Sequence, residues 1–407
     1  MDEFLYLDTA RVGRMSPGAH RAAADYLSLA ATEGGSAYFG RFLRSGFAAC
    51  PDRMRACYPG LTHWNGIASL KHSLRALAGS RPDLPILLAS RSAQLMRLSA
   101  RLLFQRCRCV LASDLGWPGY HAILEAEGRR VSRPVTVVPL YETVGAGRMT
   151  EEEVVDTMCR EYVARRCDGL FLTAVSHLGV RLPVERIVRR LEAAHEVRFV
   201  VVDGAQDFCH ASADLRDEYC DFYLTGCHKW LRAYHPLGLG FYGRRRTQGV
   251  IETTLSHLKT AGELDDPLLR FSMDLEAGGL DRYSETVNLA PLFSCQGAVA
   301  DGCVSSDYPH AVLAARLRNR DVIAGLAAES GWQPTLPAHG LRSGILLAQA
   351  CRPQRRRIEP ETLWDEFRNR GVALTAYEGG WIRFSMPEAP LADKDIHLLR
   401  NALRLAA

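Results

Sequence analysis

FVVVDGAQ at residues 199–206 and FYLTGCHKW at residues 222–230 decide the fold of this chain. Each stretch begins with an apolar run that is typical of a buried strand and then turns polar or glycine-rich. Asp203 closes the first run, and Lys229 follows the second. Open α/β sheets bind ligands at the carboxyl ends of their strands, so we expect the two side chains to meet at one edge of a sheet.

Similar apolar runs recur along the first 250 residues, with amphipathic helical patterns between them. The predicted helices include residues 93–104, 151–165 and 183–194. This alternation predicts an α/β fold with a mostly parallel sheet that carries helices on both faces. The seven predicted strands are residues 85–88, 110–112, 135–140, 170–173, 199–202, 222–224 and 238–242.

The pattern changes after residue 250. Helical patterns continue through 297–328, and strands are predicted at 344–348 and 381–384, with helices at 360–370 and 392–405. We therefore predict a large domain at 21–250 and a smaller C-terminal α+β domain at 251–407, which includes an interface segment. Residues 1–20 are predicted to pack with the small domain.

An acid and a lysine at neighbouring strand ends suit pyridoxal phosphate. The lysine amine forms a Schiff base with this cofactor, and the acid keeps the pyridine nitrogen protonated so that the ring can act as an electron sink. Taken alone, Asp203 also fits a helix N-cap after a strand, and Lys229 fits an ordinary surface lysine. Their combination favours the cofactor.

These residues resemble the class V aminotransferase family, which also holds cysteine desulfurases and isopenicillin N epimerase-like enzymes. Asp203, Gln206, His228 and Lys229 match its Asp-x-x-Gln turn and its His-Lys pair, and YLDTA at 6–10 is similar to its opening strand. The resemblance implies a fold type I enzyme with pyridoxal 5′-phosphate on Lys229. It also implies that Gln206 donates a hydrogen bond to the phenolic oxygen of the cofactor and that His228 supports the phosphate of the cofactor.

Two turns that follow strands supply further candidates for binding the cofactor. In ASRSAQ at 89–94, the resemblance implies that Ser92 and Ala93 form a phosphate cup at a helix N-terminus, where backbone N–H groups bind anions. In SDLGWP at 113–118, it implies that Trp117 stacks on the cofactor ring. The alternatives are a serine N-cap without a ligand and a tryptophan in a core or interface.

The remaining candidates lie farther along the chain. In AVSHLG at 174–179, the resemblance implies that Ser176, or failing it His177, meets the phenolic oxygen. In YSETVN at 283–288, Thr286 would reach the phosphate of a partner subunit, so that a homodimer shares its active sites. Arg383 in WIRFS at 381–385 would hold the substrate carboxylate, because a guanidinium binds carboxylate bidentately. A surface ion pair is its alternative role.

The expected reaction is that of an aminotransferase-like enzyme acting on a small α-amino acid, through an external aldimine and a quinonoid. A class V lyase or an epimerase is the alternative, and a catalytically inactive binding module with this fold is the second. A desulfurase is disfavoured because residues 370–380, where that subgroup carries its cysteine, contain none, and Cys351 lies before the preceding helix.

Composition excludes several other classes. The 407 residues are 47% hydrophobic and 24% charged, and a net charge of +4 is too small to imply a nucleic-acid partner. The twelve cysteines form no CxxC pair, so neither disulfides nor a metal site is expected. The first residues do not resemble a signal peptide, and no stretch is long enough to span a membrane. We therefore expect a cytoplasmic protein.

Overall fold

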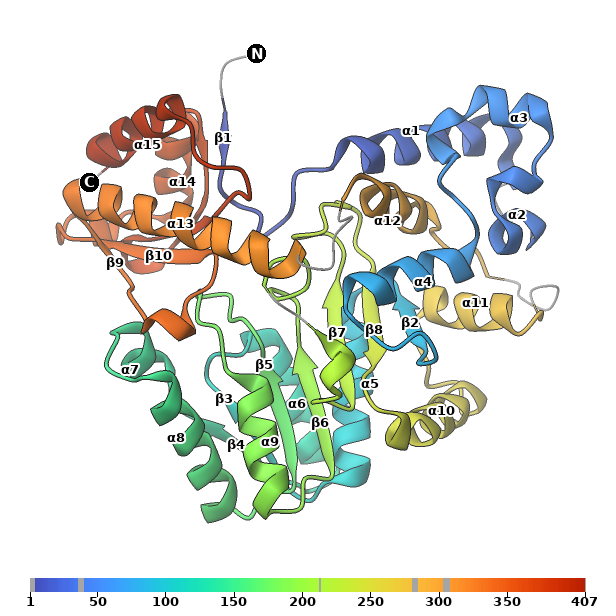
Figure 1. Ribbon diagram of the computed structural model, residues 1–407, viewed down its shortest axis with the longest axis horizontal. Coiled ribbons are helices and arrows are strands. Elements are labelled where there is room, and N and C mark those ends of the chain that lie inside the picture. Colours follow the sequence, from blue (N-terminus) through green and yellow to red (C-terminus); the bar gives the residue numbers. More distant parts are fainter. Residues whose placement is uncertain (1–3, 36–39, 212–213, 280–284, 303–307, 407) are drawn as a thin grey trace.

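The computed structural model describes residues 4–35, 40–211, 214–279, 285–302 and 308–406 (Figure 1). Its centre is a seven-stranded sheet in the order β2-β8-β7-β6-β5-β3-β4, in which only β8 runs antiparallel to its neighbours. The predicted seven-stranded, mostly parallel sheet is confirmed. Its strands are β2 (Ile86–Ala89), β3 (Val110–Ser113), β4 (Val135–Val138), β5 (Gly169–Thr173), β6 (Phe199–Asp203), β7 (Phe222–Gly226) and β8 (Gly238–Tyr242).

Helices cover both faces of this sheet, as the alternating pattern predicts (Figure 1). Successive residues of β6 point to opposite faces, so Val200 and Val202 belong to one apolar core and Phe199 and Val201 to the other. The first core includes residues of α4 (Ile67–Leu77), α8 (Glu151–Ala164) and α9 (Val184–Ala194). The second includes residues of α5 (Ser92–Arg106), α6 (Pro118–Arg130) and α10 (Arg245–Thr260).

The C-terminal unit is a smaller antiparallel sheet with helices packed against it. Its strands run in the order β12-β13-β10-β9 and are β9 (Trp332–Pro334), β10 (Ile345–Ala350), β12 (Thr375–Tyr377) and β13 (Trp381–Ser385). Helices α13 (Tyr308–Glu329), α14 (Pro360–Arg368) and α15 (Asp393–Ala406) accompany it. Arg383 lies on the central strand β13, opposite Thr375 on one side and Leu347 on the other.

The N-terminal segment joins this unit through a short parallel pair, β1 (Leu5–Tyr6) with β11 (Val372–Ala373). The predicted boundary at residue 250 falls inside α10, however. Helices α10, α11 (Pro267–Glu276) and α12 (Ala290–Asp301) contribute to the cores of the large sheet. Residues of these three helices thus pack with the large unit, whereas α13 contributes Ile323, Leu326 and Ala327 to the core of the C-terminal unit.

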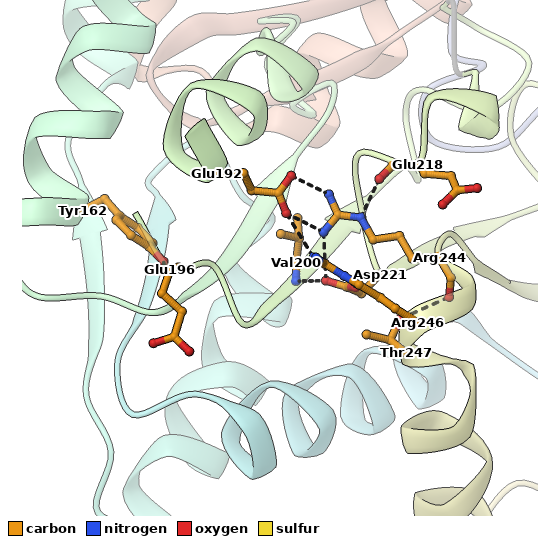
Figure 2. Close-up of polar contacts among 9 residues, drawn as sticks. All are labelled: Tyr162, Glu192, Glu196, Val200, Glu218, Asp221, Arg244, Arg246 and Thr247. Carbon is orange, nitrogen blue, oxygen red and sulfur yellow. Dashed lines mark hydrogen bonds and ion pairs between the residues drawn. The ribbon is translucent and has the colours of Figure 1, made fainter. Parts of the chain in front are cut away.

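A buried ion network lies at the opposite ends of the strands from Asp203 and Lys229. Figure 2 shows the Arg244 guanidinium beside the Glu192 carboxylate, at 2.8 and 3.0 Å, and near Asp221, at 3.6 Å. Asp221 accepts a hydrogen bond of 2.7 Å from the backbone N–H of Val200. Burial raises the pKa of Asp221, and Arg244 opposes this shift. The network ties α9 and α10 to the starts of β6 and β7, and so supports the strands that carry Asp203 and Lys229.

Candidate active site

A cavity of about 740 Å³ opens at the carboxyl ends of the central strands. Thr173 and Asp203, the last residues of β5 and β6, line it together with Lys229, which follows β7. The C-terminal unit and the N-terminal segment complete the lining. A second hollow of about 900 Å³ contains neither Asp203 nor Lys229. The smaller cavity is the candidate site because the reactive groups gather there.

Asp203 and Lys229 are brought together as predicted, and burial moves both toward their neutral forms. Burial raises the pKa of Asp203 to about 6, although the Lys229 ammonium opposes the shift. Burial lowers the pKa of Lys229 to about 8; Asp203 raises it, and the Arg383 cation lowers it. Gly204, directly after Asp203, lets the Tyr223 ring approach the backbone, because a Cβ there would lie 1.9 Å from that ring. The lysine is therefore closer to a free amine at neutral pH than a surface lysine is.

The predicted phosphate end of the site contains Ser92 and His228. Ser92 begins α5 and lines the cavity, and its Oγ accepts a hydrogen bond of 2.8 Å from the hydroxyl of Tyr120. Within the described part of the chain, the buried Nδ1 of His228 has no hydrogen-bond partner. Burial and Lys229 lower the pKa of His228 to about 4, so its imidazole is neutral at pH 7. Ala93 follows Ser92 but packs against the core instead of lining the cavity.

Trp117 lies at the mouth of the cavity, directly before α6. Half of its surface is exposed, and its ring meets the Tyr120 ring edge to face at 5.2 Å. An exposed indole face beside the cavity is compatible with stacking on a bound ring, which stays a prediction. Tyr120 was not predicted. Its spacing of one helical turn from Trp117 was the available signal.

The turn at residues 174–179 differs from the expectation. The Ser176 side chain is fully buried, and its Oγ accepts hydrogen bonds from the backbone N–H groups of Leu178 and Val180, at 3.2 and 3.1 Å. It does not line the cavity, whereas the alternative, His177, does. Serine hydroxyls commonly bind the backbone of their own turn, which turns this side chain away from the site.

Gln206 lines the cavity, and both ends of its amide are engaged. Its Nε2 donates to the Ala10 carbonyl at 2.7 Å, and its Oε1 accepts from the Trp230 indole at 2.8 Å. A second N–H of the same Nε2 remains for a bound group. The proposed donation to a phenolic oxygen therefore stays a prediction.

Arg383 lies in the cavity wall within a buried group from three segments. Its Nη2 donates to Thr375 Oγ1 at 3.0 Å and lies 3.6 Å from the Asp8 carboxylate. Thr375 in turn donates to Asp8, and the Tyr377 ring lies 5.7 Å from the guanidinium carbon. Its Nη1 donates to the His177 carbonyl at 3.4 Å, and its buried Nε has no partner within the described residues. Thr375 and Tyr377 were not predicted, because their strands are only a few residues long.

Thr286 does not line the cavity and is exposed. Its neighbour Glu285 forms an ion pair with Arg270 at 2.6 Å. Tyr283 and Ser284, which begin the quoted turn, lie outside the described residues. The placement of Thr286 on a partner's phosphate stays a prediction.

The residues present fit pyridoxal phosphate. The ring nitrogen needs an acid, the aldehyde needs an amine, and the phosphate needs donors; Asp203, Lys229 and the Ser92–His228 end can supply them. The buried nitrogen of His228, without a partner in the described residues, is a further sign that a ligand completes the site.

A comparison with protein families finds a match to the model "Aminotransferase class-V" over residues 119–267, which include Asp203 and Lys229. The part of the chain that carries both residues is thus similar to the class V aminotransferase family. The predicted family resemblance is confirmed.

Among the proteins similar to this chain is isopenicillin N epimerase from Amycolatopsis lactamdurans, 28% identical over 257 residues. That match covers 58% of this chain and 58% of the epimerase, less than two thirds of either. The solved cysteine desulfurase CsdA from Escherichia coli shares the fold with a TM-score of 0.70 and 16% identity, over 99% of this chain and 94% of CsdA. A C-DES variant with glycine covalently linked to its PLP cofactor has a TM-score of 0.69 and 14% identity, over 99% of this chain and 97% of that variant.

No helix within the described ranges has the length and apolar character that crossing a bilayer requires. Among the same residues, no group of three or more His, Cys, Asp or Glu side chains is arranged as a metal site.

Proposed function

We propose that this protein is a pyridoxal-phosphate-dependent, aminotransferase-like enzyme that acts on a small α-amino acid. The observation that carries the proposal is the meeting of Asp203, Lys229 and Arg383 around one cavity. An acid, an amine and a guanidinium there match the ring nitrogen, the aldehyde and the substrate carboxylate. The family match supports the same chemistry.

Each of these residues has a separate task. Bound at Lys229, pyridoxal phosphate supplies an electron sink for the carbanion at the substrate Cα. The Asp203 carboxylate holds a proton on the ring nitrogen, and Arg383 orients the substrate through its carboxylate. Lys229, with its pKa near 8, takes the proton from the substrate Cα and returns it elsewhere. Trp117 covers the mouth of the cavity and limits the entry of water.

Epimerisation is the second candidate, and His177 favours it. Its imidazole lines the cavity, and its buried Nδ1 has no partner within the described residues. Burial, the Arg383 cation and Lys229 lower its pKa to about 4, so it is neutral at pH 7. Inversion at Cα by two groups needs a second proton carrier on the face opposite Lys229, and His177 is the candidate for that task. Elimination by a lyase remains a further alternative.

Desulfuration and an inactive binding module have less support. Cys351 is exposed, follows β10 and does not line the cavity, and residues 370–380 contain no cysteine. An inactive module would have no need of a lysine whose pKa is lowered beside a buried acid.

Borohydride trapping tests the proposal. The purified protein mixed with pyridoxal phosphate should show a visible absorbance band that borohydride bleaches, and peptide mapping should find the reduced cofactor on Lys229. Lys229→Ala is the control and should carry no label. A label on another lysine, or none on the wild type, would refute the assignment.

A panel of amino acids then separates the reactions. Keto acid formed with an acceptor indicates transamination, ammonia without an acceptor indicates elimination, and the D-isomer indicates epimerisation. Labelled Lys229 with no product from any amino acid would favour the inactive module instead.

A further inference from the structure

Trp230, the neighbour of Lys229, is buried in a stack of three side chains. The His210 ring lies parallel to it, with centroids 3.8 Å apart and an interplanar angle of 11°. The Arg316 guanidinium carbon lies 4.7 Å from the centre of the indole. Stacking on a planar cation and a planar ring restricts rotation of the indole. Trp230 is therefore held in one orientation.

Hydrogen bonds from the C-terminal unit and from the turn after β6 hold the stack. The backbone N–H of Gly344, which precedes β10, donates to His210 Nε2 at 2.9 Å. His210 Nδ1 faces the backbone carbonyl oxygen of Gln206, which can only accept a hydrogen bond. Nδ1 therefore carries the proton, and the ring is neutral. Burial and the Arg316 cation hold the pKa of His210 well below its usual value. A Cβ at Gly344 would lie 2.7 Å from His210 Nε2, so this close approach needs glycine.

The orientation of the Gln206 amide follows from its two partners. The Trp230 indole can only donate, so the Gln206 atom 2.8 Å away must be the oxygen. The Ala10 carbonyl can only accept, so the atom 2.7 Å from it must be the nitrogen. The reversed amide would place donor against donor and acceptor against acceptor. The N–H₂ group therefore has one arrangement, with its second N–H left for a group in the cavity.

We propose that Trp230 is a positioning residue that fixes the Gln206 amide so that its nitrogen, rather than its oxygen, serves the bound cofactor. The inference rests on the proposed function, since it concerns the phenolic oxygen of pyridoxal phosphate. A donated hydrogen bond stabilises the phenolate and weakens its hold on the proton of the neighbouring Lys229 nitrogen. Trp230 thus acts on the cofactor through Gln206.

Trp230→Phe tests this inference because phenylalanine keeps an aromatic ring for His210 and Arg316 but removes the indole N–H. Without that donor, only the Ala10 carbonyl still orients the Gln206 amide, and the second N–H of its Nε2 is no longer held toward the cavity. The pH midpoint of the visible absorbance change of the cofactor-loaded protein should then rise by about one unit, the size expected for one hydrogen bond to a charged oxygen. This readout does not depend on turnover.

Trp332→Phe is the matched control. The Trp332 indole is also buried, but it donates to the backbone oxygen of Leu403, at 3.1 Å, and not to a side chain that lines the cavity, as Trp230 does through Gln206. Its loss should lower stability and leave the pH midpoint unchanged. A shift of equal size in both variants would overturn the proposal.

A double mutant shows whether Trp230 acts through Gln206. Gln206→Leu should raise the midpoint as Trp230→Phe does, and the two changes together should give no further rise. Additive shifts would overturn the inference. Gln206→Glu keeps an acceptor for the indole but has no donor for the cavity, and it tests the inference even if Trp230→Phe does not fold. An unchanged midpoint in Gln206→Glu would refute it.

Failure of the inference and failure of the proposed function give different results. A wild type that takes up no pyridoxal phosphate on Lys229 would overturn both. A wild type labelled on Lys229, together with an unchanged midpoint in folded Trp230→Phe, would overturn the role of Trp230 alone.

Discussion

Gly13→Ala should displace the backbone of Lys229. Gly13 is buried, and its backbone N–H donates to the His228 carbonyl at 2.8 Å. A Cβ at Gly13 would lie 2.0 Å from the Lys229 carbonyl oxygen and 3.1 Å from the Arg232 Cα. Contacts below 3.0 Å are essentially never observed, so the two segments must separate by about 1 Å.

Two costs add in this variant. Overpacking between backbones costs about 1–3 kcal/mol, and the strained hydrogen bond to His228 is worth about 1 kcal/mol. The free energy of unfolding should therefore fall by about 2–4 kcal/mol. A displacement of about 1 Å in a reacting group can also slow a reaction on the order of 100-fold. Borohydride-fixed incorporation of pyridoxal phosphate at Lys229 should slow accordingly.

Urea unfolding and the rate of cofactor incorporation measure the two effects. Gly249→Ala is the control, because Gly249 is exposed in α10 and a Cβ there meets no atom within 4 Å. That change should be neutral or stabilising, by up to about 1 kcal/mol, since alanine is the better helix former. If Gly13→Ala has the same free energy of unfolding and the same rate of cofactor incorporation as the wild type, the close contact with Lys229 is refuted.

Three more predictions concern residues of the cavity and the proposed contact of Thr286 with a partner subunit. Asp203→Asn should still take up pyridoxal phosphate but slow α-proton exchange by on the order of 100-fold. Since Asp203 raises the pKa of Lys229, the pH midpoint of cofactor capture should also fall below about 8; an unchanged midpoint would contradict the pairing. Arg383→Ala should weaken amino-acid binding by about 2–5 kcal/mol while Arg383→Lys recovers part of it, as KM values against the cofactor affinity would show. Lys229→Ala and a bulky replacement of Thr286 should each be inactive alone and should regain activity when the two variants exchange subunits in mixed dimers. Confirmed subunit exchange without regained activity would refute the shared site.

The sequence predicted the sheet and the meeting of Asp203 with Lys229 because those signals are local. Strand runs end in short turns there, and parallel strands end at one edge of the sheet. The Ser176 turn was predicted less well, since strand periodicity does not extend into turns, and the hydroxyl binds the backbone of Leu178 and Val180 instead. The packing of α10, α11 and α12 with the large unit could not be predicted either, because an apolar helix face does not show which core it joins.

The charge states in the cavity depend on burial by segments that lie far apart in the chain. His228 and Lys229 are neighbours in sequence, and a motif shows only their residue types. The N-terminal segment reaches them through Gly13, and Arg383 arrives from β13. Desolvation then lowers the pKa of His228 to about 4 and the pKa of Lys229 to about 8. It raises the pKa of Asp203 to about 6. A lysine that forms a Schiff base needs an amine whose pKa is lowered toward 7, beside a buried acid. Lys229 has this lowered pKa only when all these segments are folded together.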